Sequence, residues 1–256
     1  TVAIPFLSAM GHQCCPIPTA ILSNHTEFPV YFFDDYTEKM TTYTDKWKEL
    51  GLSFDAIATG FLGSEAQIGI VMEIVQKLKA EKTFVVVDPV MGDHGHAYET
   101  YTPEMCEQMK ELVCMADIVL PNVTECCILT DTPYKKENWT RRELLNMAMM
   151  LRLMGAKSVV ITGVREGSYY TNVVLERGQM EAKFIRTRSS GGERPGTGDV
   201  FSSVVAGALL NGKSLPEAVA QAAGFVKECI KVSDEEQIPH ANGVCFEKIL
   251  GKLIKK

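Results

Sequence analysis

A glycine-rich stretch at residues 191–198 is followed directly by Asp199 and by a run of small and apolar residues that predicts a helix over about 199–211. The first N–H groups of a helix have no partner inside the helix, so they are free to face an anion. A carboxylate beside such a site suits a base that takes a proton from a hydroxyl group, which then attacks a phosphoryl group. Asp199 is equally suited to capping the helix, because Asp is favoured in a first turn. The residues alone leave both roles open.

Oxygen-bearing side chains follow the predicted strands, where ligands of open α/β sheets bind. Asp88 and Asp93 bound the segment Asp-Pro-Val-Met-Gly-Asp, which leaves a β-branched run at 83–87. Asn122 and Glu125 stand three residues apart at a helix start. Such oxygens suit a hydrated Mg²⁺ that bridges phosphates. Asn122 and Glu125 are equally suited to capping their own helix.

The elements that position these residues alternate along the chain, which implies an α/β fold with a mainly parallel sheet between helical layers. Helices are expected at about 1–11, 38–50, 64–78, 140–155, 199–211, 214–231 and 243–254, and from Thr102 onward. Capping boxes are expected at Ser64 with Gln67 and at Thr140 with Glu143, and Thr102 is expected to cap its helix before Pro103. Strands are expected at 13–21, broken by Pro16 and Pro18, and at 54–59, 83–87, 118–120 and 158–161, with an antiparallel hairpin over 168–174 and 180–185. The sequence has no internal repeat and no linker, so we expect one domain over residues 1–256.

Composition argues against several classes of protein. The 256 residues are 46% apolar with a net charge of -6 and no strongly basic cluster, which argues against a nucleic-acid partner. No apolar run approaches the roughly 20 residues that span a bilayer, so no membrane segment is expected. The eight cysteines include no C-x-x-C spacing, so they predict neither a zinc site nor a redox motif. They are typical of core residues in a reducing, cytoplasmic compartment.

One further motif would place a phosphate-binding loop at a different position in the chain. Residues 207–214 match the phosphate-binding pattern G-x-x-x-x-G-K-S at every required position. That pattern works only as a loop between a strand and a helix, whereas the run at 199–211 is helical. We therefore interpret Gly212 as the end of one helix and Ser214 as the cap of the next.

Taken together, five segments resemble the pyridoxal kinases of the ribokinase-like superfamily. They are Ser23-Asn24-His25-Thr26, Gly60-Phe61-Leu62-Gly63-Ser64, Asp88 to Asp93, Pro121-Asn122-Val123-Thr124-Glu125 and Gly196-Thr197-Gly198-Asp199. The likeness runs from Thr1 to the C-terminal helix in the same order. The family's first strand has no counterpart before Thr1, so we expect that strand to be missing from this sequence.

The resemblance implies a three-layer α/β/α ribokinase-like fold and a cytoplasmic homodimer. It implies ATP and Mg²⁺ as co-reactants, with a monovalent cation as a further ion. The implied reaction transfers the γ-phosphoryl group of ATP to the 5′-hydroxymethyl group of pyridoxal, pyridoxine or pyridoxamine, the B6 vitamers.

The resemblance also implies a role for each matching residue. The implied catalytic group is the base Asp199 with the anion-binding amides of Gly196, Thr197 and Gly198. The implied substrate contacts are His25, Thr26, Phe61 and Asp199. The implied ATP contacts are Asp88, Asp93, Asn122, Thr162, Gly163, Thr197 and Gly198, and the implied metal ligands are Asp88, Asp93 and Glu125. Phe61 and Leu120 depart from the Tyr and Thr that relatives often carry, at a substrate contact and a monovalent-ion contact.

Two other functions are compatible with the sequence. Hydroxymethylpyrimidine kinases of thiamine synthesis share the fold and act on a similar ring, but they commonly carry Cys in place of the turn's Asp and lack Gly-Asp after Asp-Pro-Val-Met. Asp199 and the pair Gly92-Asp93 therefore favour the pyridoxal substrate. The other alternative is a non-catalytic vitamin-binding protein that has kept the fold.

Overall fold

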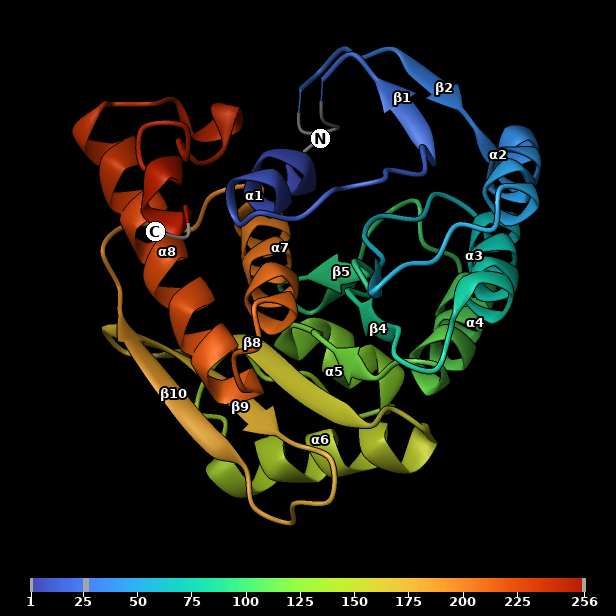
Figure 1. Ribbon diagram of the computed structural model, residues 1–256. Helices are drawn as coiled ribbons and strands as arrows, with labels where there is room; N and C mark the ends of the chain where they lie inside the picture. The colour runs from blue at the N-terminus through green and yellow to red at the C-terminus, as the bar shows by residue number, and fades with distance from the viewer. Residues whose placement is uncertain (1, 25–27, 255–256) are drawn as a thin grey trace. The chain divides into compact units, whose positions relative to one another are not determined.

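The computed structural model describes residues 2–24 and 28–254. Its main sheet has six strands in the order β10-β9-β8-β7-β4-β3. The strands at one edge of this sheet, β8, β9 and β10, are labelled in Figure 1. The four strands from β8 to β3 pair in parallel, and helices separate them along the chain. The expected α/β class with a mainly parallel sheet is confirmed.

Two small antiparallel sheets accompany the main one, formed by β1 with β2 and by β5 with β6. The strands are β1 (Ala20–Leu22), β2 (Phe33–Asp35), β3 (Ala56–Ala58), β4 (Phe84–Val87), β5 (Gly92–Asp93), β6 (His96–Ala97), β7 (Ile118–Val119), β8 (Ser158–Glu166), β9 (Tyr169–Leu175) and β10 (Lys183–Arg188). The helices are α1 (Ala3–Ala9), α2 (Thr37–Glu49), α3 (Glu65–Leu78), α4 (Pro103–Cys114), α5 (Val123–Leu129), α6 (Arg141–Met154), α7 (Thr197–Leu210) and α8 (Leu215–Glu235), with 3₁₀ turns η1 (His240–Asn242) and η2 (Leu250–Leu253).

The chain forms two compact units. Unit 1 comprises Thr1–Pro16, Arg165–Asn172 and Phe184–Lys256, and unit 2 comprises Ile17–Val164 and Val173–Lys183. The expectation of one domain over residues 1–256 stays a prediction. Among the described residues, no helix combines the length and the apolar character needed to cross a membrane.

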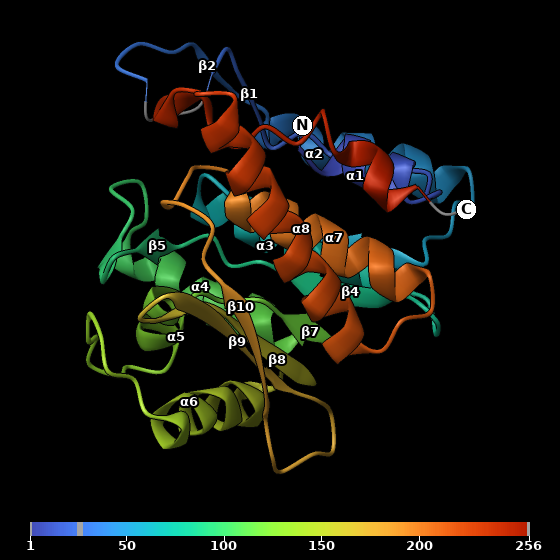
Figure 2. The ribbon, with the colours of Figure 1, turned by 90° about the vertical axis from the view of Figure 1, so that its left-hand side faces the viewer.

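Unit 1 is built on three helices, with α7 packed against both α1 and α8 (Figure 2). A glycine makes the close approach of α1 possible, because a Cβ atom on Gly207 would lie 2.6 Å from the sulfur of Met10. His12 and Asn211 add hydrogen-bonding contacts to the carbonyls of Gly207 and Met10 at 3.0 and 3.1 Å. The small residues that predicted α7 therefore also allow α1 to pack closely against it.

Unit 2 buries the β-branched run that predicted β4. Val85, Val86 and Val87 are each at most 1% exposed, as expected for a strand covered on both faces. Helices α3 and α4, which flank this strand in the sequence, pack on each other. The caps expected at Thr102 and Thr140 are present, where each hydroxyl accepts a hydrogen bond from the N–H three residues on.

The capping box expected at the start of α3 is only half formed. Ser64 Oγ accepts a hydrogen bond from Gln67 N at 3.3 Å, as predicted. The Gln67 side chain does not return this bond, because it accepts from Gly63 N and donates to Thr19 O, both at 2.8 Å. Gln67 is 1% exposed and so links the start of α3 to the chain entering β1.

Two other local predictions are wrong in extent, and a third strand is present but longer than predicted. Of the broken strand expected at 13–21, only Ala20 and Ile21 belong to a strand, β1, and Pro16 and Pro18 supply no N–H for a ladder. The helix expected at 243–254 is reduced to η2, because Gly243 adopts a φ of 72° at its start. The strand expected at 158–161 continues through Gly163 to the end of β8.

The structure confirms that residues 207–214 are not a phosphate-binding loop. Residues 207–210 are the last turn of α7, and Gly212 has a φ of 81°, typical of the glycine that follows a helix. Ser214 caps α8, with its N–H donating to Glu217 Oε2 at 2.9 Å.

Candidate active site

The turn before α7, in unit 1, leaves backbone donors available. Gly196 adopts a left-handed φ of 81°, a conformation that favours glycine, and α7 begins at the next residue. The N–H groups of Thr197, Gly198 and Asp199 meet no acceptor within the described part of the chain. A Cβ atom on Gly198 would have no atom within 4 Å, so the space in front of these donors is open. The turn can therefore receive an anion.

Asp199 is the third residue of α7 and does not act as a helix cap. Its carboxylate accepts no hydrogen bond from the described residues, although its backbone carbonyl accepts one from Ser203 Oγ at 2.6 Å. Water reaches the side chain, but the surrounding protein displaces enough of its hydration shell to raise the pKa of the carboxyl. A raised pKa makes a carboxylate a stronger base. Of the two roles that the sequence left open, the geometry favours proton transfer.

In unit 2, Asn122 and Glu125 form the capping box of α5. Asn122 Oδ1 accepts from Glu125 N at 2.9 Å, and Glu125 Oε2 accepts from Asn122 N at 2.8 Å. The capping function of both side chains is therefore confirmed, and their part in binding metal and nucleotide stays a prediction.

The same helix start also holds the segment that carries Asp88 and Asp93. Glu125 Oε1 accepts from Met91 N at 2.9 Å, and Asn122 Nδ2 donates to Gly92 O at 2.8 Å. Thr124, which the sequence analysis did not single out, accepts from Gly95 N at 2.9 Å. Three side chains from one helical turn thus fix the loop that runs from the end of β4 through the β5–β6 hairpin.

The carboxylates of this loop and helix repel one another electrostatically. Glu125 is 3% exposed, and burial followed by the charge of Asp88 raises its pKa to about 8. Asp88 itself is buried at the end of β4, while Asp93 is exposed on the β5–β6 hairpin and accepts a hydrogen bond from His94 N at 2.7 Å. Buried carboxylates that repel each other favour a cation nearby.

The carboxylates of this loop and helix suit Mg²⁺, which keeps several water ligands, better than a metal ion whose ligands are all protein side chains. The described residues contain no group of three or more His, Cys, Asp or Glu side chains arranged to hold a metal ion. Mg²⁺ usually takes one or two carboxylates and completes its shell with water and substrate phosphates. Asp88 and its neighbour Glu125 suit that arrangement.

Thr162 and Gly163 lie within β8 rather than beyond its end. Thr162 N donates to Pro121 O at 2.8 Å, and Thr162 forms a parallel bridge with Asn122. Gly163 has a φ of 66°, in the left-handed region that favours glycine. The structure thus brings Thr162 next to Asn122, as the expectation of a shared sheet edge requires.

Of the other residues expected to contact the substrate, the structure describes Phe61 alone. Phe61 follows β3 and is 37% exposed, with its carbonyl accepting from Thr19 Oγ1 at 3.4 Å. His25 and Thr26 lie outside the described residues.

We expect Glu125→Gln to lower the free energy of unfolding by about 1–3 kcal/mol, because one of its two buried N–H partners would then face the new amide group. Glu143→Gln is the matched control, since Glu143 occupies the same position in the exposed capping box of α6. Denaturant unfolding near pH 7 compares the two variants. Equal losses of unfolding free energy in the two variants would contradict the larger contribution that we assign to the buried hydrogen bonds of Glu125. The family resemblance also implies a metal role for Glu125. On that expectation, Glu125→Gln should raise the Mg²⁺ requirement of activity, and an unaltered magnesium titration would leave Glu125 only its capping role.

A mainly parallel sheet with acidic loops, together with a glycine turn and an aspartate at a helix start, is the architecture of a small-molecule kinase. The family model described as phosphomethylpyrimidine kinase matches residues 7–245. The chain therefore belongs to this kinase family, within the ribokinase-like superfamily.

Curated relatives include kinases for two kinds of ring. The chain is 32% identical over 174 residues to a hydroxymethylpyrimidine/phosphomethylpyrimidine kinase of Aquifex aeolicus, a match that covers 67% of this chain and 66% of that relative. It is 31% identical over 218 residues to a pyridoxine kinase of Bacillus subtilis, covering 82% of this chain and 74% of that one.

Among solved structures, a putative phosphomethylpyrimidine kinase from Bacteroides thetaiotaomicron is 38% identical. Its rhombohedral form superposes with a TM-score of 0.96 and covers 100% of this chain and 88% of that chain. Its orthorhombic form, which contains pyridoxal, gives a TM-score of 0.94 and covers 99% of this chain and 89% of that chain.

Proposed function

We propose that this protein is an ATP-dependent kinase that phosphorylates the 5′-hydroxymethyl group of a B6 vitamer. The observation that carries the proposal is Asp199, a carboxylate with a raised pKa and no hydrogen-bond partner among the described residues, on a helix start whose N–H groups are open. Membership of a kinase family supports the reaction type.

In this mechanism Asp199 accepts the proton of the substrate hydroxyl as its oxygen attacks the γ-phosphorus of ATP. The bond from that phosphorus to the bridging oxygen of ADP breaks, and ADP leaves. The N–H groups of Thr197 and Gly198 stabilise the negative charge on the transferred group. Asp88, Asp93 and Glu125 would hold Mg²⁺, which neutralises phosphate charge when bound. Asn122 with Thr162 and Gly163 would contact the nucleotide.

The relatives support two substrates. The pyridoxal-containing structure of the Bacteroides protein and the Bacillus pyridoxine kinase support a B6 vitamer. The Aquifex relative supports hydroxymethylpyrimidine, a ring that also carries a hydroxymethyl group, as the second candidate. Asp199 and Gly92-Asp93 favour the vitamer. A cytoplasmic homodimer remains part of the proposal, on the family resemblance.

The pKa of Asp199 gives a pH prediction. A base must be ionised, so kcat/KM should fall as the pH drops through the pKa of Asp199. Because that pKa is raised, the fall should lie above the ordinary Asp value of about 4. A pH profile of kcat/KM checks this. A fall centred at or below about pH 4 would contradict the role of Asp199.

The reaction itself is tested by measuring ADP release from ATP and Mg²⁺ in the presence of pyridoxal, with mass spectrometry of the product. We expect one phosphate added to pyridoxal for each ADP released. Binding of pyridoxal in a calorimeter without any ADP release would instead identify a non-catalytic vitamin-binding protein.

A further inference from the structure

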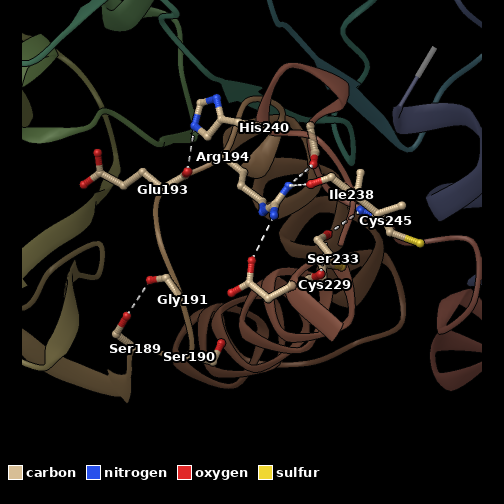
Figure 3. Close-up of polar contacts among 12 residues, drawn as sticks. Ser189, Ser190, Gly191, Glu193, Arg194, Cys229, Ser233, Ile238, His240 and Cys245 are labelled. Atoms are coloured by element: carbon tan, nitrogen blue, oxygen red, sulfur yellow. Dashed lines mark hydrogen bonds and ion pairs between the residues drawn. The ribbon is translucent and has the colours of Figure 1, made fainter. Parts of the chain in front are cut away.

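Arg194 connects the glycine-rich turn to the end of α8 and to the segment after it, within unit 1, through hydrogen bonds and an ion pair. Its Nη1 donates to the carbonyls of Ile238 and Gly243 at 3.0 and 3.2 Å, and its Nη2 pairs with Asp234 Oδ1 at 2.9 Å (Figure 3). The Arg194 side chain is 10% exposed. Carbonyls near a helix C-terminus carry partial negative charge, so this is a favourable place for a cation.

The residues before Arg194 also lie along α8 and the segment after it. Ser190 Oγ donates to Lys227 O at 2.7 Å, and His240 Nε2 lies 3.0 Å from Glu193 O. Gly191 approaches so closely that a Cβ atom there would lie 2.1 Å from Asp234 Oδ2. The turn is therefore tied to α8 and to the segment after it at Ser190, Glu193 and Arg194, and Figure 3 draws the bonds of Glu193 and Arg194.

Beyond Arg194 the turn has few anchors. Gly196 and Gly198 have no side chains, and Asp199 makes no side-chain hydrogen bond within the described structure. The hydroxyl of Thr197 returns to Arg194, where it donates to the backbone carbonyl at 3.1 Å. Arg194 is thus the last point at which a side chain ties the turn to the rest of unit 1 before the open N–H groups begin.

We propose that Arg194 is a positioning residue for phosphoryl transfer, acting through the turn that carries the open N–H groups and Asp199. This inference rests on the proposed function. Displacing a catalytic group by about 1 Å can cost about 100-fold in rate. The loss should fall on kcat rather than on the KM for the vitamer, because the N–H groups are assigned to charge that develops in the transition state.

The test compares Arg194→Ala, Arg194→Lys and Asp234→Asn in the full chain. Arg186→Ala is the matched control, because Arg186 pairs with Glu166 at 3.3 Å and lies over the ring of Tyr169, and both of these partners are in the same unit but outside the turn. We expect Arg194→Ala to lower kcat about 10- to 100-fold with KM for pyridoxal within about threefold. Arg194→Lys, whose ammonium cannot reproduce the planar guanidinium fork, should lose part of kcat and keep the fold. Asp234→Asn should fall between wild type and Arg194→Ala, and Arg186→Ala should match wild type.

Hydrogen exchange supplies a readout that does not depend on activity. Amides of residues 197–203 should exchange faster in folded Arg194→Lys than in wild type, and those of β4 should be unchanged. Retention of kcat within about twofold in Arg194→Ala, or a loss matched by the unfolded fraction of that variant, would overturn the inference. Unchanged exchange in Arg194→Lys would overturn it as well. A wild-type protein without turnover would contradict the proposed function, and the exchange comparison would still decide whether Arg194 holds the turn.

Discussion

Asp199→Asn is expected to lower kcat by about 10²- to 10⁴-fold, the range for loss of a positioned acid or base. The substitution keeps the size of the side chain and removes its ability to accept a proton. The affinity for ATP should be unchanged or slightly higher, because a negative charge beside the phosphates has gone. Steady-state kinetics and nucleotide titration measure the two effects separately.

Stability provides the control for Asp199→Asn. The carboxylate makes no hydrogen bond with the described residues, and partial loss of its hydration shell raises its pKa. An ionised group with a raised pKa weakens folding above its unfolded pKa, so the neutral variant should melt at the same temperature or slightly higher. If the variant kept more than about a tenth of the wild-type kcat, the proton would leave by another route and the mechanism would be wrong.

Gly198→Ala is expected to lower kcat/KM for ATP by about 100-fold, comparable to the loss of one donor from an anion-binding site. The Cα–Cβ bond of a helical residue tilts toward the helix N-terminus, so the new methyl group would stand among the open N–H groups. The protein itself has room for it, since no atom lies within 4 Å of that position.

Gly224→Ala is the matched control for this prediction. Gly224 lies within α8 in the same unit, and a Cβ atom there also has no atom within 4 Å. Ala is favoured over Gly by about 1 kcal/mol in a helix interior, so neither variant should lose stability. Similar kcat/KM values for the two variants would show that the turn does not bind phosphate.

Much of the fold could be predicted because its signals are local. The buried run at 83–87 and the caps at Thr102 and Thr140 depend on neighbours within a few residues, and each appears where expected. The β5–β6 hairpin was missed because its strands, Gly92–Asp93 and His96–Ala97, contain none of the β-branched residues that indicate a strand. The C-terminal segment was misjudged because Ile249 and Leu253 are buried at helical spacing without a continuous helix between Gly243 and η2.

The candidate site likewise contains local features that the sequence predicts and long-range contacts that it does not. The residue types in the turn and in the acidic loop were evident from the sequence, and so was the capping role of Glu125. Its second bond, to Met91 N, joins residues 34 apart, and no spacing rule predicts it. Arg194 was missed because its carboxylate partner, Asp234, lies 40 residues away and its other acceptors are backbone carbonyls. Long-range partners of loop residues become visible only in the folded chain.

The most direct test of the proposed substrate is a comparison of kcat/KM for pyridoxal and for 4-amino-5-hydroxymethyl-2-methylpyrimidine, with saturating ATP and Mg²⁺ and the same preparation of protein. Rings that differ in one or two substituents are commonly separated by about 10- to 200-fold in kcat/KM. We predict a preference of at least about tenfold for pyridoxal. An equal or greater kcat/KM for the pyrimidine would contradict the assignment and identify the chain as a hydroxymethylpyrimidine kinase.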